Sequence, residues 1–224
     1  MSDNILVERN GFVGIIIINR PEKLNAMTPA MADALAAAVE GFNTDDTIRC
    51  VISTGAGEKA FCAGSDISTL DSYETPWAFR NRPDYCDALR ALLKPSIAAV
   101  NGYAFGGGLE TAMTCDIRIA SDNASFAAPE VKLGWIGGGG MAVNLAHAVG
   151  PSNAALMIMT GDAIDAATAE RWGPGLPGVT ARLPHGGSKG CSHHHRVARA
   201  YCSRNGETQF AGGVGNEHRR CHRV

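Results

Sequence analysis

Two glutamates in the middle of the chain stand beside turns that suit acid–base chemistry. Glu110 follows three glycines, residues 106–108, which join an apolar run (96–100) to a stretch with helical patterning. Backbone N–H groups at such a junction point outward with the helix dipole behind them, which favours an anionic oxygen. Glu130 ends a second small-residue turn, residues 125–130. These features indicate an active site, although a turn used only for tight packing and a glutamate that only complements a helix dipole fit the same residues.

A third small-residue turn, residues 61–67, can also expose backbone N–H groups. Within it Asp66 is a candidate cap for the segment that follows. The glycine triplet matches neither common nucleotide-binding motif, because no Gly-Lys-Ser/Thr follows it and a dinucleotide fingerprint spaces its glycines more widely. The three turns therefore point to an oxyanion rather than a phosphate as their ligand.

Strands that alternate with helices predict an α/β protein around these turns. Residues 5–8 and 12–19 are expected to form a hairpin through Asn10–Gly11. Thr28 and Pro29 are expected to start a helix, as N-cap and first helical residue. Further strands are predicted at 48–54, 96–100 and 116–120, and further helices after Gly140 and at 154–160 and 166–172.

The segment 73–90 mixes aromatic and charged side chains, among them Trp77, Phe79, Arg80, Arg82 and Tyr85. Two interpretations fit this composition. The segment is either a loop and helix beside a pocket or a helix on the surface.

The composition is that of an ordinary globular protein, with 45% hydrophobic and 19% charged residues among 224. A formal net charge of −2 argues against a general nucleic-acid binder, and no apolar run is long enough to predict a membrane span. Residues 1–4 do not resemble a secretory signal. Seven cysteines without framework spacing are typical of a reducing compartment, so a cytoplasmic protein is expected.

The composition changes near Gly173. Residues 1–172 hold 12 Lys and Arg against 20 Asp and Glu, whereas residues 173–224 hold 8 against 2. The second part also contains six of the seven histidines, ten of the 27 glycines and no Ile or Met. We therefore expect a catalytic core over residues 1–172 and an atypical, irregular Gly/His/Arg-rich tail over residues 173–224.

An ordered set of motifs between about residues 5 and 173 resembles the enoyl-CoA hydratase/isomerase (crotonase) superfamily. The motifs are Asn-Arg-Pro at 19–21, Asn-Ala-Met at 25–27, Phe-Cys-Ala-Gly-Ser-Asp-Ile at 61–67, Ala-Val-Asn-Gly-Tyr-Ala-Phe-Gly-Gly-Gly-Leu-Glu at 99–110, Cys-Asp at 115–116, Phe-Ala-Ala-Pro-Glu at 126–130 and Thr-Gly-Asp-Ala-Ile-Asp-Ala at 160–166. Each is weak alone, but their order and spacing together are specific.

The resemblance implies a superhelix of β-β-α repeats whose subunits form trimers or hexamers. It implies an acyl-CoA thioester as substrate, with coenzyme A as part of that substrate, no metal or redox cofactor, and neither nucleic acid nor membrane as a partner. Two backbone N–H groups, which map onto Ala63 and Gly107, would stabilise a thioester enolate. The resemblance also suggests a set of substrate-binding residues: Lys23, Leu24, Ala26, Ala63, Gly64, Ser65, Asp66, Ile67, Tyr103, Gly107, Gly108, Pro129, Leu133 and Gly134.

The two carboxylates select among activities of this family. Members that resemble hydratases carry glutamate at the positions of both Glu110 and Glu130, whereas isomerases usually use one acidic residue. The resemblance therefore favours hydration of a 2-enoyl-CoA, with Glu110 as base toward water and Glu130 as proton donor. An isomerase or another acyl-CoA enzyme of the family is the first alternative, and a catalytically inactive protein of the same fold is the second.

Residues 135–140 depart from the family, whose hydratases carry a proline and fewer glycines there. The family's acyl pocket borders this stretch, so the departure bears on acyl specificity. Trp135 is expected in the core, with a place in the acyl-pocket wall as the alternative.

The tail does not resemble the family. Reading residues 206–221 through permissible codons with a shift of one base gives Met-Ala-Lys-Arg-Asn-Ser-Pro-Glu-Ala-Leu-Glu-Met, which resembles the family's C-terminal helix, so out-of-frame translation is our hypothesis. The competing interpretation is a zinc site, although the spacing of its candidate ligands fits no standard finger. Those candidates are Cys191, His193, His194, His195, Cys202, His218, Cys221 and His222.

Overall fold

A computed structural model describes residues 4–173 and 181–183 of the chain. They form two sheets, of which the larger has six strands in the order β1-β2-β3-β5-β7-β10 and the smaller has four in the order β4-β6-β8-β9. The strands of the larger sheet are β1 (Ile5–Asn10), β2 (Val13–Ile18), β3 (Cys50–Gly55), β5 (Ser96–Val100), β7 (Ile117–Ser121) and β10 (Ala181–Leu183). Those of the smaller sheet are β4 (Ala60–Cys62), β6 (Tyr103–Phe105), β8 (Ser125–Ala127) and β9 (Ile164–Asp165).

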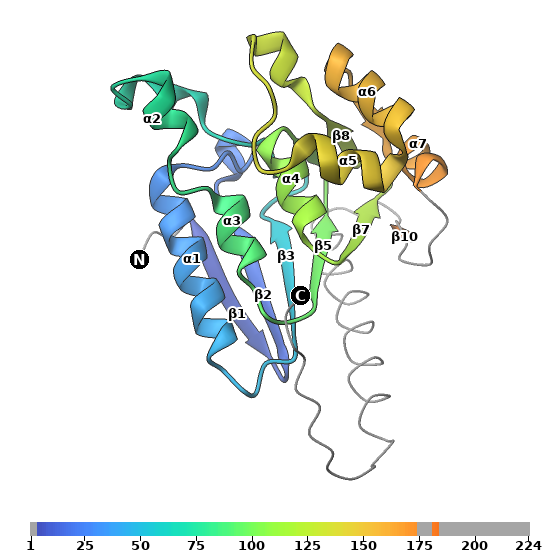
Figure 1. Ribbon diagram of the computed structural model, residues 1–224. Coiled ribbons are helices and arrows are strands. Elements are labelled where there is room, and N and C mark those ends of the chain that lie inside the picture. Colours follow the sequence, from blue (N-terminus) through green and yellow to red (C-terminus); the bar gives the residue numbers. More distant parts are fainter. Residues whose placement is uncertain (1–3, 174–180, 184–224) are drawn as a thin grey trace, which may run out of the picture.

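Seven α-helices accompany these sheets in the described part of the chain. They are α1 (Pro29–Asn43), α2 (Pro76–Arg80), α3 (Tyr85–Arg90), α4 (Gly107–Thr114), α5 (Met141–Val149), α6 (Pro151–Thr160) and α7 (Ala166–Trp172). Three 3₁₀ turns complete the elements: η1 (Pro21–Lys23), η2 (Ile67–Ser72) and η3 (Pro129–Leu133). Figure 1 shows α1 and α3 on one face of the larger sheet, with α5, α6 and α7 gathered beyond the carboxyl ends of β5 and β7.

The chain follows a repeating course through the two sheets. A strand of the larger sheet leads into a strand of the smaller one and then into helix: β3 to β4 to α2 and α3, β5 to β6 to α4, and β7 to β8 to α5. Within each sheet these successive strands run parallel. The predicted β-β-α repeats are thereby confirmed, and each repeat delivers its connecting turn to the same side of the molecule.

Local sequence explains how the first elements form. The hairpin of β1 and β2 turns at Gly11, whose φ of +59° suits glycine, and pairs Asn10 with Val13. Helix α1 begins as predicted, with the Thr28 hydroxyl accepting a hydrogen bond from the N–H of Met31 at 3.3 Å and Pro29 in its first turn.

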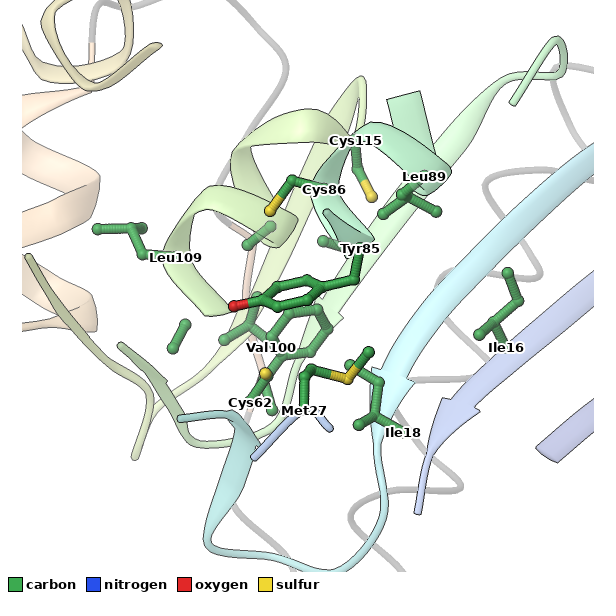
Figure 2. Packing of buried hydrophobic residues seen from close by; sticks show 14 of the residues in the cluster. Ile16, Ile18, Met27, Cys62, Tyr85, Cys86, Leu89, Val100, Leu109 and Cys115 are labelled. Atoms are coloured by element: carbon green, nitrogen blue, oxygen red, sulfur yellow. The ribbon is translucent and has the colours of Figure 1, made fainter. Parts of the chain in front are cut away.

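Strand β2 is buried along its whole length because the larger sheet has an apolar cluster on each face. Ile16 and Ile18 point into the cluster that α1, α3 and α4 complete, and Ile15 and Ile17 point into the opposite one. Figure 2 shows part of the first cluster, in which the ring of Tyr85 lies among core side chains. This core holds the helices that carry the candidate site.

Three residues of the predicted tail form strand β10, which runs parallel to β7 at the edge of the larger sheet. The tail is therefore not irregular throughout, although the sequence there shows no sustained period. The cysteines and histidines considered for zinc lie outside the described residues. Among the helices of residues 4–173 and 181–183, none combines the length and the apolar character that a membrane-spanning helix requires.

Candidate active site

The turns between the two sheets and the helices border an open cavity of about 810 Å³. All four predicted catalytic residues line it: Ala63, Gly107, Glu110 and Glu130. Six other predicted binding residues also line it, namely Gly64, Ser65, Ile67, Pro129, Leu133 and Gly134. The fold thus brings two carboxylates and two small-residue turns, distant in sequence, to one space.

Six predicted binding residues are not part of the cavity lining: Lys23, Leu24, Ala26, Asp66, Tyr103 and Gly108. Asp66 is buried beside the site, where it accepts hydrogen bonds from Arg20 at 2.6 Å and from the Ser68 N–H at 2.9 Å. Its pKa is lowered to about 2, first by the Ser68 hydroxyl and then by Arg20. The prediction that Asp66 caps the following segment is confirmed.

The turn at residues 61–67 is fixed by backbone hydrogen bonds to the segment that follows η1. The N–H of Ala63 donates to the carbonyl oxygen of Leu24 at 3.1 Å, so the fold already uses this predicted oxyanion donor. The Met27 N–H donates to the Gly64 carbonyl oxygen, and the Asp66 N–H donates to the Met27 carbonyl oxygen. These two hydrogen bonds pair Met27 with Ser65 in a parallel β-bridge. Because successive N–H groups of extended backbone alternate in direction, the Ser65 N–H faces away from Met27 and toward the cavity.

Gly107, the first residue of α4, lies directly against this turn. A Cβ atom built on Gly64 would lie 3.1 Å from the Gly107 nitrogen, which places the two backbones in contact. Gly107 is one of the first residues of a helix, whose N–H groups have no acceptor within the helix. A Cβ atom at Gly107 would overlap the hydroxyl oxygen of Tyr85, so only glycine fits here. The N–H groups of Ser65 and Gly107 thus form a pair suited to a single anionic oxygen.

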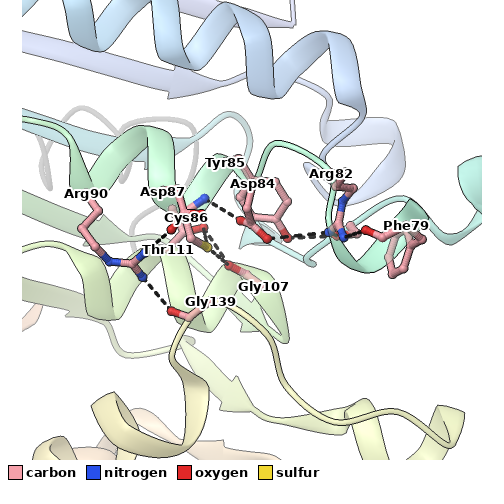
Figure 3. A network of polar contacts seen from close by, with 11 residues as sticks. Phe79, Arg82, Asp84, Tyr85, Cys86, Asp87, Arg90, Gly107, Thr111 and Gly139 are labelled. Carbon is pink, nitrogen blue, oxygen red and sulfur yellow. Dashed lines mark hydrogen bonds and ion pairs between the residues drawn. The ribbon is translucent and has the colours of Figure 1, made fainter. Parts of the chain in front are cut away.

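Glu110 lies in the first turn of α4, and its side chain is almost fully buried. The glycine run at 137–140 packs against its carboxylate: a Cβ atom at Gly139 would lie 2.7 Å from Glu110 Oε2. Arg90 on α3 holds this loop by donating to the Gly139 carbonyl oxygen at 2.7 Å, while also pairing with Asp87 (Figure 3). The glycines that depart from the family pattern therefore let the chain pass close to the candidate base.

Glu130 comes from η3 on the other side of the glycine triplet. A Cβ atom at Gly106 would lie 3.0 Å from Glu130 Oε1, so this carboxylate lies at the entrance to α4. Burial raises the pKa of Glu130 because a desolvated carboxylate is less stable than the neutral acid. A raised pKa suits a group that must carry a proton at one stage of a reaction.

The segment between η2 and β5 supplies a third part of the cavity, and the pocket-side interpretation of residues 73–90 is confirmed. Arg82 donates to the Ser65 hydroxyl at 2.9 Å and to the Phe79 carbonyl at 2.7 Å, with its guanidinium 3.9 Å from the Phe79 ring centroid (Figure 3). The Tyr85 hydroxyl lies 3.2 Å from the Ser65 hydroxyl.

The expectation that Trp135 is a core residue is wrong. Trp135 is 36% exposed and lines the cavity, with its ring centroid 5.5 Å from that of Phe79. The reason is its position: it follows the left-handed cap Gly134 at the end of η3 and leads into the glycine run, outside any buried helix or strand. The alternative, a wall of the pocket, describes its place.

A metal centre and a thiolate nucleophile at Cys62 were also considered in the described residues. No group of three or more His, Cys, Asp or Glu side chains there could hold a metal ion. Cys62 lies on β4 next to the cavity turn, but burial raises its pKa to about 12, so it is not a thiolate nucleophile at neutral pH.

Comparison with known sequences agrees with this geometry. Residues 8–175 match the family model described as enoyl-CoA hydratase/isomerase. The chain belongs to this family. It is 43% identical over 168 residues to a probable mitochondrial enoyl-CoA hydratase of Dictyostelium discoideum, an alignment that covers 74% of the chain and 60% of that protein. It is 42% identical to the mitochondrial enoyl-CoA hydratase of Pongo abelii, over 74% of the chain and 57% of that protein. The chain thus spans about three fifths of these relatives' length.

Solved structures of enoyl-CoA hydratases share the fold of this family member. One from Bacillus anthracis superposes with a TM-score of 0.78 at 31% identity, covering 90% of this chain and 76% of the other. Another, a subunit I from Geobacillus kaustophilus, gives a TM-score of 0.77 at 35% identity, covering 89% and 75%.

Several cavity residues were not assigned to the site from the sequence of this family member. Asp84, Asp87, Arg90, Ile136, Gly139, Val143 and Asn144 all line the cavity. The unusual density of glycine after Trp135 was the available signal for Gly139. Arg90 offered none, since its contact with Gly139 joins residues 49 positions apart.

Proposed function

We propose that this chain adds water across the 2,3 double bond of a 2-enoyl-CoA thioester. The observation that carries the proposal is the convergence of Glu110, Glu130 and the backbone of Ser65 and Gly107 on one cavity. The names of the aligned relatives, which are enoyl-CoA hydratases, support the same reaction class.

In the proposed reaction, the N–H groups of Ser65 and Gly107 hold the thioester oxygen. Ser65 replaces Ala63 in this role because the Ala63 N–H is already bonded to Leu24. As water attacks C3, the electron pair of the double bond moves onto the thioester oxygen and gives an enolate. Fixed backbone dipoles meet this charge without reorganisation, and each such donor contributes about 10²–10³ in rate.

The two carboxylates carry out the proton transfers. Glu110 takes the proton from the attacking water, and Glu130 delivers a proton to C2 of the enolate, so the product is a 3-hydroxyacyl-CoA. The buried position of Glu110 and the raised pKa of Glu130 fit a base and an acid held apart by different surroundings. Only water and protons are exchanged, so the reaction needs no metal or redox cofactor.

Hydratase and isomerase activities are separated by substrate. Purified protein is incubated with crotonyl-CoA, and loss of the conjugated thioester absorbance is followed together with 3-hydroxybutyryl-CoA by mass spectrometry. A 3-enoyl-CoA is supplied in parallel. Water addition to crotonyl-CoA supports the hydratase, whereas conversion of the 3-enoyl-CoA alone replaces it with the isomerase. No turnover of either substrate indicates a catalytically inactive member of the family.

Glu110→Gln and Glu130→Gln test the assigned roles. Each substitution keeps the size of the side chain but removes proton transfer, and each is expected to lower kcat by about 10²–10⁴. Hydration that survives both substitutions would refute the assignment of the carboxylates.

We infer further that subunits associate, in trimers or hexamers as in the family. On α6 the apolar side chains of Leu156 and Met159 are 53% and 75% exposed in the single chain, three residues apart on one face. Exposed apolar groups of this kind are typical of contact surfaces. Light scattering coupled to size exclusion measures the assembly, and a monomer at micromolar concentration would contradict the inference.

A further inference from the structure

The hydroxyl groups of Ser65 and Tyr85 leave one proton without an acceptor in the described part of the protein. Their oxygens are 3.2 Å apart, and only one of the two protons can lie between them. Arg82 Nη2 donates to the Ser65 oxygen at 2.9 Å, and a guanidinium can only donate. One hydroxyl proton is therefore available to a ligand in the cavity that both residues line.

The direction of the chain of hydrogen bonds decides which proton this is. A hydroxyl that accepts from a cation becomes a better donor, because hydrogen bonds in a chain polarise one another. Ser65, which accepts from Arg82, is therefore expected to donate to Tyr85. The remaining proton is that of the Tyr85 phenol, which is also the more acidic of the two hydroxyls.

The Tyr85 oxygen lies beside Gly107, one of the two backbone donors proposed for the thioester oxygen. It lies against Gly107, at the position that a side chain there would occupy, next to the first turn of α4. Figure 2 shows the phenol ring anchored in the core, with its oxygen pointing away from Ile16 and Ile18. The residue is 4% exposed and belongs to the buried core cluster, so surrounding core side chains hold the ring in place.

We propose that the Tyr85 hydroxyl donates a third hydrogen bond to the thioester oxygen of the substrate, beside the N–H groups of Ser65 and Gly107. Tyr85 is then a catalytic residue, and the Arg82 guanidinium and the Ser65 hydroxyl are positioning groups that orient it. The inference rests on the proposed acyl-CoA function and names an additional group for the same site. Burial raises the pKa of Tyr85 well above its usual range, so the phenol keeps its proton at physiological pH.

The first test compares Tyr85→Phe with the unchanged protein on crotonyl-CoA. The variant keeps the buried ring and removes only the hydroxyl. We expect kcat to fall by about tenfold to a hundredfold, at the lower end of the loss for an oxyanion donor. KM should change much less, because the bond strengthens as charge develops. An unchanged kcat with normal hydration would overturn the role of Tyr85 and leave the proposed function intact.

The second test does not depend on turnover. Cinnamoyl-CoA absorbs at longer wavelength when its carbonyl is polarised, so the shift on binding reports the donors at the thioester oxygen. The unchanged protein should give a larger red shift than Tyr85→Phe, measured at saturating protein. Equal shifts would contradict the proposal, and a protein that binds no acyl-CoA would overturn both this inference and the proposed function.

Two further variants separate catalysis from structure. Tyr73→Phe is the matched control, because Tyr73 contacts the Phe79 ring edge-on and lies outside the cavity lining; it should keep the activity and the spectral shift. Ser65→Ala keeps the backbone N–H but breaks the chain from Arg82. If the hydrogen bonds from Arg82 through Ser65 to Tyr85 act as a unit, adding Ser65→Ala to Tyr85→Phe causes little further loss of kcat. If the losses of kcat in the two single variants add fully in the double variant, Ser65 does not act through Tyr85.

Discussion

The cavity is bounded on one side by main chain and on the other by side chains. The backbone wall consists of Ala63, Gly64, Ser65, Gly106 and Gly107, small residues whose main chain borders the space. The side-chain wall consists of Phe79, Arg82, Tyr85, Arg90 and Trp135, which reach the space from α2, the link between α2 and α3, α3 itself and the segment after η3. Both walls border one cavity, yet we expect them to tolerate substitution very differently.

The difference lies in what holds each wall in place. Backbone groups are positioned by strand pairing and by the start of α4, and any added atom at Gly107 meets Tyr85. Side chains of the second wall are positioned by contacts between segments distant in sequence, such as the Phe79 ring with the Trp135 ring and the Arg90 guanidinium with the Gly139 carbonyl oxygen. We expect the backbone wall to supply most of the chemistry, with one further donor from Tyr85, and Phe79 and Trp135 in the side-chain wall to set the acyl group that fits.

The largest effect is expected at the backbone wall. Gly107→Ala forces a Cβ atom onto the Tyr85 hydroxyl, so α4 or Tyr85 must move and the donor geometry is lost. We expect a fall in kcat of about 10²–10³ and a lower Tm. Gly41→Ala is the control, because no atom lies within 4 Å of the new Cβ in α1; it should keep activity and gain up to about 1 kcal/mol in stability. Equal kcat and Tm in the two variants would show that the chemistry does not depend on the backbone at Gly107.

A smaller effect is expected where the side-chain wall supports a carboxylate. Arg90→Met removes the donor to the Gly139 carbonyl and lets the loop next to Glu110 move. We expect kcat to fall by about tenfold, the worth of one charged hydrogen bond, with partial recovery in Arg90→Lys. Arg171→Met, which removes an exposed contact with Thr168 on α7, should be silent in the same steady-state assay. An unchanged kcat in Arg90→Met would show that catalysis does not depend on the hydrogen bond from Arg90 to the Gly139 carbonyl oxygen.

Acyl selectivity should change at Trp135 with little change in chemistry. Trp135→Ala opens the wall beside Phe79 and removes apolar contact with a longer acyl chain. We expect kcat/KM for octenoyl-CoA to fall relative to crotonyl-CoA by about tenfold, since lost apolar contacts are worth about 1–3 kcal/mol per methylene-sized group. The ratio of the two kcat/KM values is the measurement. An unchanged ratio would place the acyl chain elsewhere.

The smallest effect is expected on the stability of the fold, at Glu130 in the cavity lining. The pKa of Glu130 is raised in the folded protein, so its contribution favours folding below the unfolded pKa and is lost as pH rises through the folded value. Glu130→Gln should therefore raise Tm slightly at pH 7 and leave it unchanged near pH 4. Calorimetry at both pH values checks this. A variant less stable than the unchanged protein at pH 7 would show that the ionised carboxylate is well solvated.

The sequence predicted the backbone wall better than the side-chain wall, for a physical reason. Glycine triplets, hairpin turns and N-caps such as Thr28 act over a few residues, so their structure can be read locally. The contact of Arg90 with Gly139 and the exposure of Trp135 depend on how distant segments pack. The donor role given to Ala63 shows the same limit. Only the pairing with Leu24 reveals that its N–H is already used.

Strand β10 covers the edge of the larger sheet, a role that the composition of the sequence after Gly173 does not suggest. Without residues 181–183, β7 would end the larger sheet with a row of free amides and carbonyls, open to pairing with another polypeptide. At the opposite border, β1 presents the charged side chains of Glu8 and Arg9, which discourage such pairing. Even three residues along β7 therefore act against fibrillar self-association, whatever they contribute to catalysis.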